Sequence, residues 1–348
     1  MAILTPAYCS REDVKRSLDI KETSRNNTLV DRAIASSTAN ITRNLHRTFH
    51  PLDTTKYWDW PNFQRSYPWR IWFDQSELAD VTVNPPVVTT GGVTIPDSAI
   101  FWGPWNYAPP YTFMELDRSQ SYAFGVGSTP QRDIAITGTF GYWLETDPGG
   151  TLAAAVSTTT ATTLTVSDSS LMGVGDLLII DTERLLVQDR ATSTTGQTNV
   201  SGATTASAAD DAITVSDGTQ VHADEVLLID SERMLVVDVA GDVVTVKRAW
   251  DGTILATHNT ATTIYAYRLL TVGRAQLGTT AATHSNGATV SVFRVPPLIR
   301  DLAIAESGNS VLQKSAGYAE AIGIGSSLAD LWDEAETAYG RILRQRVV

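Results

Sequence analysis

The sequence has few of the features that crosslink a protein or anchor it in a membrane. Its only cysteine, Cys9, cannot form an intramolecular disulfide, which is typical of proteins made in a reducing compartment. No apolar run approaches the ~18 residues of a membrane-spanning helix, and the N-terminus lacks a signal-peptide pattern. We therefore expect no membrane partner and no export by the usual route.

Charged residues are also scarce, at 18% of the chain, whereas hydrophobic residues make up 43%. This balance predicts a folded protein with a sizeable core rather than a disordered one. The net charge of −12 argues against tight binding to a phosphate backbone, which requires a basic surface. A length of 348 residues favours two domains, or one domain with a large insertion.

Catalytic signatures are missing as well. The sequence contains no Gly-x-Ser-x-Gly, no His-Glu-x-x-His, no phosphate-binding loop and no Gly-x-Gly-x-x-Gly that opens a helix after a strand. We expect no enzyme activity, no catalytic residues and no cofactor, and we expect Cys9 to be a small inert residue near the first helix.

The two ends of the chain carry helical patterns. Ser10 followed by Asp13 predicts a capping box at the start of a helix that continues through Ile20. A second helix is expected to start near Asn27 or Thr28 and to end before Pro51. One apolar stripe of this helix is Val30, Ile34, Ile41, Leu45 and Phe49.

Helical patterns return after Pro296. A helix is expected to begin at Pro296-Pro297, and Ser327 with Asp330 predicts a capping box for a last helix. The apolar face of the last helix includes Leu331, Trp332, Tyr339 and Ile342. An amphipathic helix needs a partner, which is either another protein or the chain's own helix beside Val30, Ile34 and Ile41.

Between these ends lies an aromatic zone, about Asp53 to Asp147, which holds seven of the nine tryptophans. Alternating segments such as Ser66–Phe73 and Asp133–Trp143 predict strands. Aromatic clusters can stack on sugars or bases, but few basic residues are interleaved here, so packing in the core and between subunits is the better interpretation. The candidates for subunit packing are Phe49, Trp58, Trp60 and Trp143.

Residues 149–294 differ abruptly from the rest and contain two internal repeats. Thr163–Asp189 aligns onto Ala212–Asp238 with 12 of 27 positions identical, sharing Ile-Asp-x-Glu-Arg-x-Leu-Val-x-Asp. Thr245–Arg268 aligns onto Thr271–Arg294 with 11 of 24 identical, sharing Arg-Ala-x-x-Gly-Thr-x-x-Ala-Thr-His. Along the chain, the two copies of the first repeated segment therefore precede the two copies of the second repeated segment.

This order predicts one small β module whose hairpin is interrupted by a complete second copy, about residues 212–268. Leu185–Asp189 is then expected to pair with Leu269–Gly273, and Met234–Asp238 with Val243–Lys247. The repeated acidic pairs and histidines (Asp181, Glu183, Asp230, Glu232, His258 and His284) are compatible with a divalent cation site. Charged turns and loop-fixing histidines are the preferred interpretation, so we predict no metal site.

Without residues 149–294, the chain resembles the head-to-tail connector (adaptor) proteins of long-tailed bacteriophages. Five blocks in this order carry the resemblance: Tyr8-Cys-Ser-Arg-Glu-Asp-Val-Lys15, Leu45-His-Arg-Thr-Phe49, Thr55-Lys-Tyr-Trp-Asp-Trp-Pro61, Phe140-Gly-Tyr-Trp143 with the Pro-Pro-opened helix, and Ala329-Asp-Leu-Trp-Asp-Glu-Ala-Glu-Thr-Ala-Tyr339. Together they span roughly 200 residues.

The resemblance implies a virion neck protein, made in the host cytoplasm, that forms a dodecameric ring beneath the portal. Such a ring continues the DNA ejection channel and provides the docking surface for stopper or tail-tube proteins. Packaged DNA passes through it without tight sequence-specific binding. The resemblance also assigns portal docking to the last segment, in which we single out Leu331, Trp332, Tyr339 and Ile342.

The predicted fold class is α+β: a small helical bundle with an aromatic-rich β region, plus an inserted all-β domain of two nested, similar modules. The predicted adaptor core is 1–148 and 295–348, and the insertion is 149–294. An alternative function is that of another phage structural protein, in the tail or decorating the capsid, whose β insertion binds a host surface glycan. A β-rich hydrolase would instead require a pocket with paired carboxylates.

Overall fold

The computed structural model describes residues 5–18, 27–61, 67–73, 76–106, 109–142, 144–200, 204–315 and 324–340. The chain divides into two compact units. The first comprises Met1–Ala39, Thr146–Gln276 and Thr280–Leu331, and the second comprises Asn40–Glu145, Leu277–Thr279 and Trp332–Val348. This division places the first helix in the same unit as the insertion. The sequence-based boundaries, which assign that helix to the core (1–148 and 295–348), stay a prediction.

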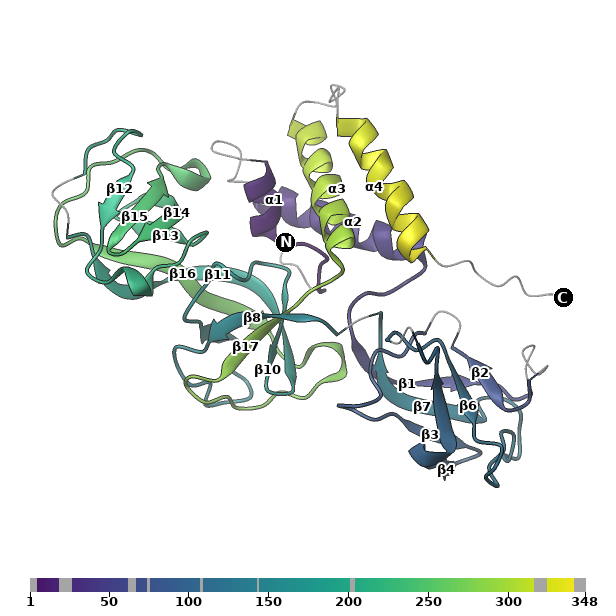
Figure 1. Cartoon of the computed structure of the whole chain (residues 1–348). Coiled ribbons are helices and arrows are strands. Elements are labelled where there is room, and N and C mark those ends of the chain that lie inside the picture. The colour runs from purple at the N-terminus through teal and green to yellow at the C-terminus, as the bar shows by residue number, and fades with distance from the viewer. Residues whose placement is uncertain are drawn as a thin grey trace. The chain divides into compact units, whose positions relative to one another are not determined.

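Four α-helices lie in the described chain: α1 (Arg11–Ser17), α2 (Asn27–Leu45), α3 (Pro297–Ser315) and α4 (Ile324–Tyr339) (Figure 1). The predicted capping box opens α1, because the Ser10 hydroxyl accepts from the Asp13 N–H and the Asp13 carboxylate accepts from the Ser10 N–H. No described helix is both long and apolar enough to cross a membrane.

Three helix boundaries differ from the sequence predictions. Helix α2 ends at Leu45, because His46 adopts a left-handed conformation with φ of 51°, so Phe49 lies beyond the helix although it is fully buried. Helix α4 begins at Ile324, three residues before the Ser327 expected to cap it. Helix α1 ends at Ser17 with Leu18 as its C-cap, which is earlier than the predicted end at Ile20; residues 19 and 20 lie outside the described residues.

The second unit contains two antiparallel sheets. The four-stranded sheet has the order β1–β7–β3–β4, with β1 (Leu52–Trp58), β7 (Ile134–Phe140), β3 (Val87–Thr90) and β4 (Val93–Ile95). The three-stranded sheet has the order β2–β6–β5, with β2 (Arg70–Trp72), β6 (Phe113–Leu116) and β5 (Ile100–Gly103). One hydrophobic cluster, which includes Ile71, Met114 and Ile136, joins side chains of both sheets.

The insertion forms a ten-stranded antiparallel sheet in the first unit. Its order is β12–β15–β14–β13–β16–β11–β10–β17–β8, and β9 pairs with β16. The strands are β8 (Thr146–Thr151), β9 (Thr163–Thr165), β10 (Leu177–Ile180), β11 (Glu183–Thr198), β12 (Ala212–Thr214), β13 (Val226–Ile229), β14 (Glu232–Ala240), β15 (Val243–Lys247), β16 (Thr263–Gly273) and β17 (Thr289–Phe293).

The strand pairing confirms the nested arrangement. Leu186 pairs with Gly273 and Val187 with Val272, so the first copy of the module closes its hairpin across the second copy. Inside the second copy, Leu235 pairs directly with Lys247. The long strands β11 and β16 run through both modules, as Figure 1 shows.

The two ends of the insertion lie side by side. Strand β8 enters the insertion and strand β17 leaves it, and they pair antiparallel with Thr146 opposite Phe293. Because the chain enters and leaves at neighbouring strands, the insertion occupies one connection of the surrounding chain, as loop insertions commonly do.

Candidate functional site: buried ion clusters and a polar cavity

Each module of the insertion is built around a buried glutamate. In the second module, Glu232 is fully buried and accepts hydrogen bonds from Arg248 through Nε (2.7 Å) and Nη2 (2.8 Å). In the first module, Glu183 accepts from Arg274 in the same two-pronged way, at 2.7 and 2.6 Å. Such pairs satisfy both partners and fix their geometry.

The equivalent backbone groups complete both clusters. Glu232 also accepts from the N–H groups of Ala249 and Ala256, each at 2.9 Å. Glu183 accepts from Ala275 (3.0 Å) and Ala282 (2.9 Å). Each glutamate thereby holds the loop that follows its arginine at equivalent positions of the two repeats.

A histidine spans two carboxylates in each cluster. His258 contacts Asp230 through Nδ1 (2.8 Å) and Glu232 through Nε2 (3.0 Å), and His284 repeats both distances with Asp181 and Glu183. Both ring nitrogens therefore face carboxylate oxygens, an arrangement that a doubly protonated ring satisfies. The histidines fix loops by hydrogen bonding, as the sequence interpretation expected.

Charge pairing within the cluster keeps the glutamates ionised. Burial opposes the ionisation of Glu183 and Glu232, but the arginine and backbone hydrogen bonds outweigh it and lower each pKa to about 2. One detail of the sequence interpretation is wrong. Only Asp181 and Asp230 lie at the hairpin turns, with φ of 54° and 51°, while the glutamates are core residues that pair with a distant arginine rather than with the adjacent one.

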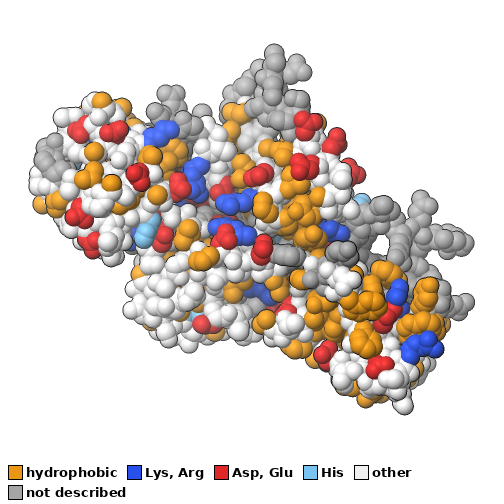
Figure 2. Space-filling view, viewed as in Figure 1, with side chains coloured by type: hydrophobic (Ala, Val, Ile, Leu, Met, Phe, Trp, Pro, Cys, Tyr) orange, Lys and Arg blue, Asp and Glu red, His pale blue; other side chains and the backbone are white. Residues whose placement is uncertain are grey.

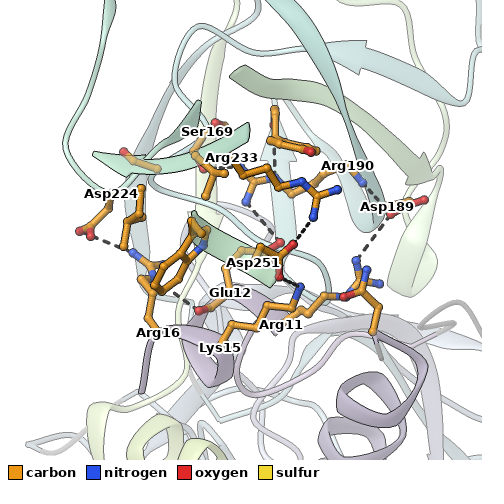
Figure 3. A pocket seen from close by; sticks show the side chains of 16 residues that line it. Arg11, Glu12, Lys15, Arg16, Ser169, Asp189, Arg190, Asp224, Arg233 and Asp251 are labelled. Atoms are coloured by element: carbon orange, nitrogen blue, oxygen red, sulfur yellow. Dashed lines mark hydrogen bonds and ion pairs between the residues drawn. The ribbon is translucent and has the colours of Figure 1, made fainter. Parts of the chain in front are cut away.

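A polar cavity of about 120 Å³ lies between α1, the second module and the turn after β9 (Figure 3). Its ion pairs join α1 to the second module: Lys15 Nζ lies 2.8 Å from Asp251 Oδ1, and Arg16 lies 3.5 Å from Asp224. Arg233 also pairs with Asp251. Figure 3 shows these side chains pointing toward one another across the opening.

The cavity carries nearly balanced charge. Five basic and four acidic side chains line it, together with the aromatic rings of Trp250 and Tyr267. Burial raises the pKa of Tyr267, although the nearby Arg233 opposes this effect. Because donors and acceptors already pair across the space, the lining has no strong preference for an anion or a cation.

Asp168, His222 and Glu225 form one further cluster of metal-ligand types, with ligand atoms within 4.8 Å of one another. Glu225 is already committed, because its oxygens accept from Arg268 at 2.8 and 2.7 Å and from the Ser169 N–H at 3.0 Å. This carboxylate joins the two modules, since Ser169 belongs to the first and Arg268 to the second.

No family model, curated protein or solved structure matches this chain. Its function is therefore inferred from its sequence and its own geometry.

The residues predicted to pack between subunits lie in different environments. Phe49 and Trp60 are buried within their own unit, where Trp60 contacts Phe124 at a ring spacing of 5.2 Å. Trp58 is half-buried against the same core, and Trp143 lies outside the described residues. Core packing thus accounts for Phe49 and Trp60, and any contact of the four with another subunit stays a prediction.

The exposed aromatic residues of this unit are different ones. Trp105 is 63% exposed and Phe101 50% exposed. Hydrophobic side chains gather on the visible face of this unit in Figure 2. These two side chains are accessible to another protein, whereas that of Phe49 is not.

The residues predicted to dock on the portal all fall on or beyond α4. Leu331 and Trp332 are half-buried. Tyr339 packs edge-on against Phe49 and Tyr142, with ring spacings of 5.8 and 5.5 Å. Ile342 lies outside the described residues. The end of α4 therefore packs on its own chain, and portal contact by this helix stays a prediction.

Sequence analysis missed the partners of the buried glutamates and the pairing of Glu225 with Arg268. The signal was present, because Arg248 and Arg274 are identical in the two repeats, as are Arg268 and Arg294. An arginine and a carboxylate that both recur in the two copies indicate an ion pair inside each module. The sequence-based interpretation weighed the acidic residues only with their nearest neighbours in the chain.

Proposed function

We propose that this protein is a structural head-to-tail adaptor of a phage virion, which forms a ring between the portal and the tail or stopper. The ring continues the DNA channel. The supporting sequence evidence is the ordered set of blocks that resembles the adaptor family, which appears once residues 149–294 are set aside.

The observation that carries the proposal is the pairing of β8 with β17 at the two ends of the insertion. This pairing makes it reasonable to treat residues 149–294 as an addition to an older core. What remains is a set of helices and an aromatic β unit, which matches the architecture that the resemblance implies. A net charge of −12 suits a channel wall to which DNA does not adhere.

The test replaces residues 149–294 with a short Gly/Ser linker and mixes the variant with purified portal rings. The proposal expects co-sedimentation with the portal at the same stoichiometry as the full-length chain. The surface of α1 that loses its partners carries mainly charged groups such as Lys15 and Arg16, so the shortened chain is expected to stay soluble. A folded variant that remains monomeric beside the portal would show that the insertion is the assembly element.

A further inference from the structure

The two modules differ at one buried carboxylate by a single methylene group. Glu225 of the second module corresponds to Asp176 of the first, and Arg268 corresponds to Arg294. Glu225 reaches its arginine at 2.7 Å, whereas the closest approach of Asp176 to Arg294 is 3.5 Å. Arg294 instead donates to Asp147 (2.9 Å) and to the Leu171 carbonyl (2.7 Å).

Asp176 ends the loop on which the N-terminal segment docks. The Ala7 N–H donates to the Gly175 carbonyl (3.0 Å), and the Arg11 N–H donates to the Val174 carbonyl (2.9 Å). In return, the Val174 N–H donates to Glu12 at 2.7 Å. The Asp176 carboxylate accepts a hydrogen bond from the Gly173 N–H of its own loop, at 2.8 Å. The loop Gly173–Asp176 is thus a joint between the first module and α1.

The charged groups around Asp176 compensate its charge only in part, because Arg294 approaches it no closer than 3.5 Å. Asp13 on α1 adds a like charge, and Arg300 on α3 is committed to Asp13 at 2.8 Å. Arg16 also lies 3.5 Å from Asp13. Cys9 on the N-terminal segment is buried, and its burial raises the pKa of the thiol, so it stays neutral.

These surroundings have opposite effects on the two equivalent carboxyls. Burial, reinforced by Asp13 and opposed by Arg294, raises the pKa of Asp176 to about 6. For Glu225, burial is outweighed by Arg268, and its pKa is lowered. The shorter side chain therefore leaves the first module with a carboxyl that titrates in the physiological range.

We propose that the loop Gly173–Asp176 is a pH-sensitive joint, in which a protonated Asp176 seats the first module on the N-terminal segment and ionised Asp176 loosens it. The direction follows from linkage. The folded joint binds the proton more tightly than the open one, so stability is gained as pH falls through the titration of Asp176 and lost as pH rises. The same loop of the second module, paired through Glu225, is insensitive in this range.

The test is amide hydrogen exchange of the full chain at pH 5.0 and pH 7.5, corrected for intrinsic exchange rates. With Asp176 titrating at about 6 when closed and 3.8 when open, the opening constant should rise about tenfold between these values. The informative amides are those of Ala7, Arg11 and Val174, which donate across the joint. Other groups also change charge between these pH values, so variants of Asp176 assign the effect.

Three substitutions separate the explanations. Asp176→Asn should keep the joint protected at both pH values. Asp176→Glu, which restores the longer side chain of the second module, should abolish the pH dependence. The reciprocal Glu225→Asp should make the exchange of the Ser169 and His222 amides pH-dependent. Identical pH profiles for the wild type and Asp176→Asn would overturn the proposal, even if Asp176→Glu failed to fold.

Discussion

Replacing Glu232 with glutamine tests the buried cluster of the second module. The substitution preserves the shape of the side chain but removes its charge. Five donors converge on the carboxylate: two from Arg248, the N–H groups of Ala249 and Ala256, and His258. A glutamine amide must turn its NH₂ group toward some of these donors, and it leaves the Arg248 guanidinium buried without a counter-charge.

Breaking a buried pair by removing one charge costs about 3–5 kcal/mol. That is a large share of the 5–15 kcal/mol typical of a whole domain. We therefore expect Glu232→Gln to unfold the second module locally while the first stays folded. Glu183→Gln is the matched variant, with the same loss expected in the first module, and Asp238→Asn removes an exposed charge from the same module as a control.

Urea unfolding and hydrogen exchange measure the effect. Exchange should rise across residues 212–268 in Glu232→Gln and remain at the wild-type level in Asp238→Asn. A loss below about 1 kcal/mol, within the range of a surface ion pair, would refute the reasoning that these clusters hold the modules together. An equal rise of hydrogen exchange in both modules would show that they do not unfold independently of one another.

Three further predictions address the modules and α4. Glu183 and Glu232 have pKa values lowered to about 2, so their contribution to stability is fully present above their ordinary pKa of 4.5 and is lost as the pH falls through 2. Circular dichroism should therefore show the insertion still folded at pH 3.5. Unfolding of the insertion already at pH 4 would contradict this prediction. Deleting 212–268 should leave a cooperative thermal transition, since the first module's cluster lies outside that segment, and a non-cooperative melt would argue against nesting. Tyr339→Ala should lower the free energy of unfolding by about 1–3 kcal/mol, because two ring contacts are lost. Trp332→Ala should instead weaken portal binding with little change in melting temperature. If Trp332→Ala lowered the melting temperature and Tyr339→Ala weakened portal binding, α4 would not be part of the portal contact as proposed.

The sequence was sufficient to predict the nested topology. Both copies of the first repeated segment precede both copies of the second, and this order is most simply explained by one pairing of the strands. Strands β11 and β16 pair in that way. Strand pairing is predictable here because a repeat carries its register with it. The capping box at Ser10 was also readable, since it depends on two residues three positions apart.

The interiors of the modules were less readable. Glu232 and Arg248 lie 16 residues apart, and Glu183 and Arg274 lie 91 apart, so no local pattern joins them. The end of α2 was missed because a left-handed His46 stops the helix where the apolar periodicity continues to Phe49. Burial of a charged residue depends on its distant partner, which local propensity does not contain.

The proposed adaptor function is tested most directly by negative-stain imaging of the full-length chain mixed with purified portal. The adaptor account predicts one additional ring of density on the portal axis, absent from portal alone. Trimeric or scattered particles of the chain beside undecorated portal rings would contradict it.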